Sequence, residues 1–415
     1  MSINSGRELY RRTQLDNGIR VVTETLPHVR SLAIGIWIDT GSRDEPEQLA
    51  GISHYLEHMN FKGTERRSPL EIARSIEGHG GQLNAFTGKH ETCFYARVIS
   101  SHLVRAVDVL ADITQHSVYD PTETIKERKV ILEELKNVED TPDEMVFEYF
   151  WAEMYPNHSL GRTVIGTPKT LKKINPARLR EYSQSHYCGS RIVVAVTGDV
   201  DHDRLVELIQ QQFKSDQPSQ RLRVAPQNDL TGHSHHEHHS STQQAHILWG
   251  LHGITYYDPR KYALFIMNTV LGGGMSSRLF QHIREDRGLA YTVYSFLETL
   301  PDSGMFGVYA GTDPENVEQT LNLIKEDVLW FADNLLSDEE LDRTKDQLKG
   351  ALLLGLESPS SRMNRLARME SLTGGYLSID DIIENINAVS AESIKELASE
   401  MFTNKPTVTT LLLPK

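Results

Sequence analysis

The chain has 415 residues, of which 39 % are hydrophobic and 24 % charged, an ordinary composition for a folded protein of two or three domains. Its net charge of -14 argues against nucleic acid as the main partner, because phosphate binding requires an excess of lysine and arginine. The two cysteines, Cys93 and Cys188, lack CxxC spacing, and no signal segment or membrane-length apolar run is present, so we expect a cytoplasmic protein with neither disulfides nor membrane contact.

A faint internal repeat predicts two related halves. An apolar strand, a turn rich in Asp and Pro and a helix follow one another from Ser31 and again from Gln244, an offset of about 213 residues. Strand-like runs that begin at Ile192 and Thr407 close the two halves.

Long amphipathic helices are predicted over 69–76, 106–116 and 121–138, and Asp120 and Pro121 suit the N-cap and first turn of the last one. Helices mixed with strands predict the α+β class, with two homologous domains that are each an antiparallel-rich sheet covered by helices.

The polar segment from Ser215 to Ser241, with its prolines and glycine, indicates a linker. The expected domains are therefore a catalytic, metal-binding domain over 1–218, a linker over 219–240, and a homologous domain without metal over 241–415.

The strongest chemical signal is His54-Tyr-Leu-Glu57-His58. Residues four apart lie on the same side of a helix, so His54 and His58 could present two imidazoles to one ion. At about 100° per residue, both lie nearly opposite the helix's apolar stripe, and Glu57 lies close enough to reach a metal-bound water. Taken alone, the motif leaves open a solvated helix face that binds nothing.

A second helix adds two carboxylates. Glu127 and Glu134 share a face with apolar residues, and a carboxylate in such a setting is costly unless it is paired or bound to a cation. We predict that Glu134 is a third metal ligand and that Glu127 orients one of the histidines. Salt bridges to a neighbouring helix are the alternative.

Three protein ligands leave the fourth tetrahedral position of Zn²⁺ for water, whose pKa the metal lowers to about 7. Glu57 is predicted to act as general base: it takes the proton of that water, the hydroxide attacks a peptide carbonyl, and the proton passes to the leaving amine. One Zn²⁺ per chain is expected, although nitrogen and oxygen ligands alone do not exclude Mn²⁺ or Co²⁺.

HxxEH is the inverted zincin motif, and here Met59-Asn-Phe-Lys-Gly-Thr64, Glu127 and Glu134 follow it. With these residues the chain resembles, over nearly its whole length, the pitrilysin or insulinase family of metallopeptidases. Within that family it is similar to the branch of the mitochondrial processing peptidase β subunit and bacterial processing proteases. The resemblance implies a two-lobed zinc endopeptidase that hydrolyses peptides or unfolded segments in an enclosed chamber.

The run GGQLNAFT over 80–87 resembles the family's edge strand, which pairs with the substrate backbone. The resemblance implies that Asn84, Ala85 and Phe86 contact the peptide. An ordinary hairpin is the alternative.

Arg284 and Tyr291 match the arginine and tyrosine with which family members hold the substrate carbonyl. The resemblance implies catalytic and substrate-binding roles for both, with Tyr291 as an oxyanion donor. A surface arginine and a core tyrosine are the alternative.

The repeat places the three motif residues of the first half on Met267, Val270 and Leu271, so only the first half is expected to bind metal. Family members of this length usually pair two chains. Since this chain carries both the zinc set and the Arg/Tyr pair, we expect a homodimer, with a heterodimer left open. The alternative function is a catalytically silent scaffold or peptide-binding subunit of the same fold.

Two further features are interpreted without a role. Five histidines at 233, 235, 236, 238 and 239 lie in the predicted linker and are interpreted as a solvated segment without fixed geometry, with a metal-buffering protein as the rival function. The glycines 272–274 lack the GxxxxGK[ST] pattern, which argues against nucleotide binding.

Overall fold

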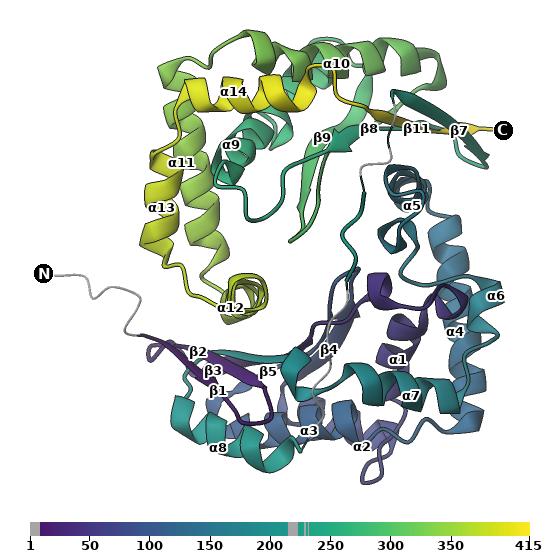
Figure 1. Cartoon of the computed structure of the whole chain (residues 1–415), viewed down its shortest axis with the longest axis vertical. Helices are drawn as coiled ribbons and strands as arrows, with labels where there is room; N and C mark the ends of the chain where they lie inside the picture. Colours follow the sequence, from purple (N-terminus) through teal and green to yellow (C-terminus); the bar gives the residue numbers. More distant parts are fainter. Residues whose placement is uncertain (1–8, 215–222, 228–229, 231) are drawn as a thin grey trace, which may run out of the picture. The chain divides into compact units, whose positions relative to one another are not determined.

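The computed structural model describes residues 9–214, 223–227, 230 and 232–415 (Figure 1). The chain forms two compact units, each assembled from three stretches of sequence. The first unit holds the described residues of Met1–Leu135, Arg162–Arg223 and Leu354–Ile379. The second holds those of Lys136–Gly161, Val224–Leu353 and Asp380–Lys415. Both mix sheet and helix, and the predicted α+β class is confirmed.

The first unit is built on a six-stranded sheet with the order β1-β2-β6-β3-β5-β4. Its strands are β1 (Tyr10–Gln14), β2 (Arg20–Thr25), β3 (Ser31–Ile38), β4 (Gln82–Thr87), β5 (Thr92–Ile99) and β6 (Ile192–Gly198). Its helices are α1 (Ile52–Asn60), α2 (Pro69–Ile76), α3 (Leu103–Gln115), α4 (Pro121–Glu139), α6 (Pro168–Leu171), α7 (Pro176–His186), α8 (His202–Gln212) and α12 (Pro359–Thr373).

The second unit is built on a five-stranded sheet with the order β7-β11-β8-β10-β9. Its strands are β7 (Ser234–Ser240), β8 (Ala245–His252), β9 (Ala290–Thr299), β10 (Gly304–Thr312) and β11 (Val408–Pro414). Its helices are α5 (Pro142–Met154), α9 (Lys261–Gly272), the π-helix η8 (Phe280–Glu285), α10 (Val317–Asp333), α11 (Asp338–Gly355), α13 (Ile379–Asn387) and α14 (Ala391–Phe402).

The two sheets repeat one another, as the sequence offset predicts. In the first, the parallel pair β2–β6 is followed by the antiparallel strands β3, β5 and β4. In the second, the parallel pair β7–β11 is followed by the antiparallel strands β8, β10 and β9. The sheets are thus mixed, with one parallel pair in each.

The predicted helices form close to their expected bounds. The range 69–76 is α2, whereas α3 starts three residues before the expected 106, and α4 begins at Pro121 as expected. Asp120 caps α4, since its Oδ1 accepts the backbone N–H groups of Thr122 and Glu123 at 2.8 and 2.9 Å.

Each sheet buries both faces, and one helix on each comes from a distant part of the chain. On the first sheet α12 packs against β2, β3 and β6. Its residues Met363, Leu366 and Ala367 join a buried cluster there. A salt bridge between Arg12 and Glu370 at 3.0 Å ties α12 to β1. On the second sheet α5 packs against β8 and β11.

These two helices change the expected division of the chain. Residues 136–161 belong to the second unit and 354–379 to the first, so the compact units do not follow the boundaries 1–218 and 241–415. Part of the predicted linker, 219–222, 228–229 and 231, lies outside the described residues. The last seven residues of the predicted linker are not a linker. Ser234–Ser240 form the strand β7, which pairs with β11.

The histidine tract therefore has a fixed geometry, contrary to expectation. Along β7 the side chains alternate between the two faces of the strand. On one face, Nε2 of His238 lies 2.7 Å from a carboxylate oxygen of Glu153 in α5, and Tyr149 stacks on the same imidazole. On the other face, His235 lies 3.1 Å from Glu237 and is half exposed.

No helix in the described part of the chain combines the length and apolar character needed to cross a membrane.

His202 gives the first unit a pH dependence. The side chain is 2 % exposed, and hydroxyls of Thr13 and Thr23 lie 2.8 Å from its two ring nitrogens. Burial lowers the pKa of His202 below its usual value. As the pH falls below about 6.5, the unfolded chain takes up a proton that the folded chain refuses, so stability is lost with falling pH.

We expect His202→Gln to flatten this loss. Urea unfolding between pH 7 and pH 5 should show a smaller decrease in unfolding free energy for the variant than for the wild type. The exposed His28 provides the control, because His28→Gln should keep the wild-type slope. A variant slope equal to that of the wild type would refute the role of His202.

Candidate metal centre

The helix α1 packs one face into the core and leaves its histidines on another. Ile52, Tyr55, Leu56 and Met59 are at most 1 % exposed and belong to the core of the first unit. This apolar stripe fixes the rotation of the helix, and the imidazoles of the motif then face α4 rather than the sheet.

His54, His58 and Glu134 come together as the sequence predicts. Nε2 of His54 lies 3.6 Å from one carboxylate oxygen of Glu134, and Nε2 of His58 lies 3.6 Å from the other. The three ligand atoms lie within 4.8 Å of one another, the only such group of three among the described residues. Ligands 2.0–2.2 Å from a tetrahedral zinc are roughly 3.4 Å apart, so this donor set fits Zn²⁺.

The two histidines differ in their surroundings. Burial and the neighbouring His58 lower the pKa of His54 to about 3, which keeps that imidazole neutral, as a metal ligand must be. Burial also lowers the pKa of His58, but the hydrogen bond to Glu127 and the nearby carboxylates raise it above its usual value.

Glu127 lies against His58. Its Oε1 lies 2.8 Å from Nδ1 of His58, which leaves Nε2 directed at Glu134. Its other oxygen pairs with Lys62, just after the end of α1, at 2.8 Å, so Glu127 also makes an ion pair of the kind that the sequence left open as the alternative. Burial alone would raise the pKa of Glu127. The hydrogen bonds and charges of His58 and Lys62 outweigh this effect and bring the pKa below its usual value, so the carboxylate stays ionised although the residue is only 4 % exposed.

Glu57 lies beside this group and is partly buried. Burial raises the pKa of Glu57, while a hydrogen bond from the hydroxyl of Thr87 opposes the rise. Thr87 is the last residue of β4, so it ties the edge strand to the carboxylate. This contact was not predicted from the sequence, where the only signal for Thr87 is its place at the end of the GGQLNAFT run.

The strand β4 is an edge of the first sheet. It pairs with β5, and Asn84, Ala85 and Phe86 stand opposite Tyr95, Phe94 and Cys93. Asn84 and Phe86 are exposed, whereas Ala85 packs on the core. An edge strand with free backbone groups can pair with an extended peptide.

In the second unit, Arg284 and Tyr291 form a pair. The Arg284 guanidinium donates to the Tyr291 carbonyl at 2.8 Å and lies 4.5 Å from the centre of its ring. Tyr291 is 74 % exposed at the start of β9, which removes the alternative of a core tyrosine and leaves its hydroxyl accessible.

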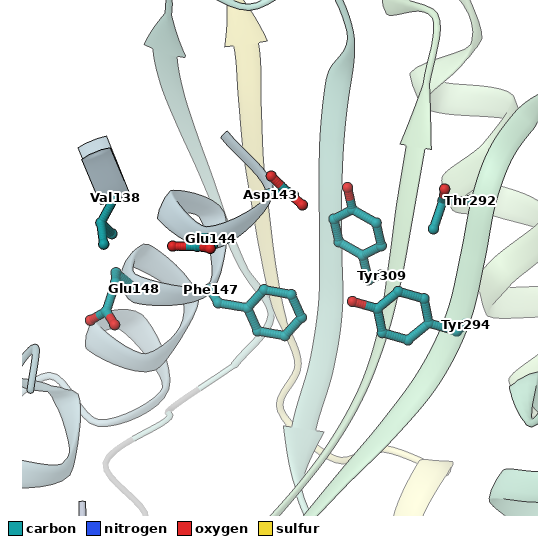
Figure 2. A pocket seen from close by; sticks show the side chains of 8 residues that line it. All are labelled: Val138, Asp143, Glu144, Phe147, Glu148, Thr292, Tyr294 and Tyr309. Carbon is teal, nitrogen blue, oxygen red and sulfur yellow. The ribbon is translucent and has the colours of Figure 1, made fainter. Parts of the chain in front are cut away.

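The second unit also holds an open pocket of about 480 Å³ between α5 and the strands β9 and β10 (Figure 2). The α5 side contributes three carboxylates and a phenyl ring, and the strands contribute two tyrosines and a threonine. With Val138, the lining residues are Asp143, Glu144, Phe147, Glu148, Thr292, Tyr294 and Tyr309. The lining is thus acidic and aromatic.

Comparison with known proteins shows which family the chain resembles. The model of "Insulinase (Peptidase family M16)" matches residues 20–168, and that of "Peptidase M16 inactive domain" matches residues 173–348. The chain is 42 % identical over 402 residues to the uncharacterized zinc protease YmxG of Bacillus subtilis, covering 95 % of this chain and 96 % of that protein. It is 40 % identical over 415 residues to an uncharacterized zinc protease of Streptomyces coelicolor, covering 97 % and 89 %.

Among solved structures, the chain shares its fold with a protease from Helicobacter pylori, with a TM-score of 0.90 at 23 % identity over 97 % of this chain and 99 % of that one. A "peptidase M16 inactive domain" protein from Pseudomonas fluorescens matches with a TM-score of 0.91 at 19 % identity over 98 % of both chains. The chain therefore belongs to the M16 (insulinase) family of peptidases, whose matching relatives are named zinc proteases.

Proposed function

We propose that the protein is a zinc-dependent endopeptidase that hydrolyses peptides or unfolded polypeptide segments, with one Zn²⁺ per chain. The observation that carries this proposal is the convergence of two imidazole Nε2 atoms on the two oxygens of Glu134, with the Glu57 carboxylate beside them. The alternative, a catalytically silent scaffold or peptide-binding subunit, would not need the carboxylate of Glu57.

The chain's own residues have separate tasks. His54, His58 and Glu134 would hold the zinc, which when bound supplies Lewis acidity to a water and a peptide carbonyl. Glu127 keeps the proton of His58 on Nδ1, so that Nε2 is free to bind. Glu57 takes a proton and returns it to the leaving amine, and Thr87 orients the carboxylate for this transfer.

Substrate contacts are proposed for both units. An extended peptide would add to β4 through backbone hydrogen bonds, next to Asn84, Ala85 and Phe86. Tyr291, held by Arg284, would donate its hydroxyl to the developing oxyanion. The acidic and aromatic pocket in Figure 2 suits a cationic side chain, which favours substrates rich in lysine or arginine. We further propose an enclosed chamber, a homodimer and a cytoplasmic location.

The general base is tested by Glu57→Gln. The amide cannot accept a proton, so cleavage of a quenched fluorescent peptide should fall by several orders of magnitude while zinc content stays at the wild-type level. Glu47→Gln, an exposed change of the same kind, is the control. Equal turnover by Glu57→Gln and wild type would remove Glu57 from the mechanism.

Glu127→Gln tests the orientation of His58. Loss of the charge on this hydrogen bond should weaken zinc binding by roughly 10–100-fold, measured by competition with a chelating dye. Glu123, partly exposed on the same helix and paired with Lys126 at 2.6 Å, provides a matched control in Glu123→Gln. An unchanged dissociation constant in Glu127→Gln would contradict the role.

Tyr291→Phe tests the oxyanion donor. Removing the hydroxyl should lower kcat by roughly 10²–10³ with zinc content unchanged. The backbone carbonyl that Arg284 binds stays in place in this variant, so the local structure is kept. Steady-state kinetics identical to those of the wild type would refute the assignment.

A further inference from the structure

The two zinc-binding histidines are fixed by different means. Nδ1 of His58 is held by Glu127 at 2.8 Å. Nδ1 of His54 is buried, and no group in the described part of the chain forms a hydrogen bond with it. The direction of the His54 imidazole therefore depends on its packing and on the position of its backbone, which lies in the first turn of α1.

That first turn is held by Glu45. Its Oε2 accepts the backbone N–H of Gly51, and its Oε1 accepts that of Ser53, both at 2.7 Å. The residue stands between two short 3-10 helices, Ser42–Asp44 and Glu47–Leu49, and is 4 % exposed. A carboxyl group at this end of a helix accepts hydrogen bonds from two N–H groups that have no partner within the helix. The positive end of the helix dipole also interacts favourably with its ionised form.

Glu45 and the two residues whose N–H groups it accepts, Gly51 and Ser53, are each held by further contacts. The Arg162 guanidinium donates to the backbone carbonyl of Glu45 at 3.0 Å. Gly51 has φ +93°, and a Cβ there would lie 2.4 Å from the carbonyl oxygen of Ile165, so only glycine fits. The hydroxyl of Ser53 lies 3.0 Å from that of Tyr182. The residue before His54 is thus held through its N–H and its side chain.

Burial of the ionisable side chain of Glu45 costs free energy. Burial raises the pKa of Glu45 to about 8, against the opposing effect of the Ser53 and Gly51 N–H groups. A neutral side chain such as serine or asparagine also caps helices, and without this cost. The burial of an ionisable group indicates a demand for a rigid, two-pronged contact at this turn.

We infer that Glu45 is a positioning residue of the metal centre, which fixes the first turn of α1 and thereby directs the imidazole of His54 at the ion. This inference rests on the proposed zinc site. Glu127 orients His58 by a hydrogen bond to its side chain. Glu45 would orient His54 through the backbone of the helix turn in which His54 lies.

The test compares Glu45→Gln and Glu45→Ala with the wild type and with Glu47→Gln, which removes a charge from an exposed position two residues away. Apo-proteins are prepared with a chelator, and zinc affinity is measured by dye competition. We expect Glu45→Ala to weaken zinc binding by roughly 10–100-fold, as loss of other groups that orient ligands does, and Glu45→Gln to weaken it less because one acceptor remains. Glu47→Gln should match the wild type.

Two further readouts separate positioning from simple stability. The visible spectrum of the Co²⁺-loaded protein reports the geometry of the ligands, and it should change in Glu45→Gln but not in Glu47→Gln. Glu45 and Glu127 act on different histidines of the same ion, so the fold loss of zinc affinity in the double variant Glu45→Gln/Glu127→Gln should differ from the product of the two single losses.

A purely structural role for Glu45 would give a different pattern. A lower melting temperature of Glu45→Gln with zinc affinity and Co²⁺ spectrum unchanged would overturn the inference, as would loss of its cooperative melting transition. Should Glu45→Ala fail to fold, the zinc affinity and Co²⁺ spectrum of Glu45→Gln decide between the two roles. A wild-type protein that binds no zinc would instead overturn the proposed function, and this inference with it.

Discussion

The charge balance between α1 and α4 is the constraint on which the site depends. Glu57, Glu127 and Glu134 stand around two imidazoles, one of which burial keeps neutral, and Lys62 is the only lysine or arginine that pairs with any of the three carboxylates among the described residues. Such an arrangement is electrostatically unfavourable without a further cation. A divalent ion between the imidazoles and Glu134, as in the proposed zinc site, would supply the missing charge and would account for the carboxylates on a helix face that otherwise packs apolar residues.

The second unit shows what the same scaffold becomes without this constraint. Its five strands follow the order of β2, β6, β3, β5 and β4 in the first sheet, without a counterpart of β1, and the repeat places Met267, Val270 and Leu271 where the first half has its motif. All three are at most 6 % exposed and belong to the core. Apolar side chains stand at the positions of the donors, so the equivalent helix contributes to the hydrophobic core instead of a metal site.

The sequence predicted what local patterns determine. Helical spacing brought His54 and His58 to one side of α1, and a cap with proline marked the start of α4, because both depend on neighbouring residues. Features that depend on distant contacts could not be predicted this way. The exchange of α5 and α12 between the units leaves no local trace, and the strand formed by the histidine tract depends on pairing with β11, which follows about 170 residues later. Thr87 and Lys62 looked like ordinary polar residues until the fold placed them against carboxylates.

The same charge balance accounts for the different surroundings of the two histidines, of which only His58 has a carboxylate on its Nδ1 in the described part of the chain. Another carboxylate on Nδ1 of His54 would add a negative charge to a site that already has an excess of them, and it would have to be buried beside an imidazole whose pKa is about 3. At the start of α1, Glu45 instead meets two N–H groups and the positive end of a helix, which oppose the rise of its pKa that burial causes. In the proposed arrangement, Glu45 therefore positions His54 through the backbone of the first turn of α1 and not through its side chain. No additional carboxylate is then needed beside His54, so the negative charge around the ligands stays at a level that one divalent ion can balance.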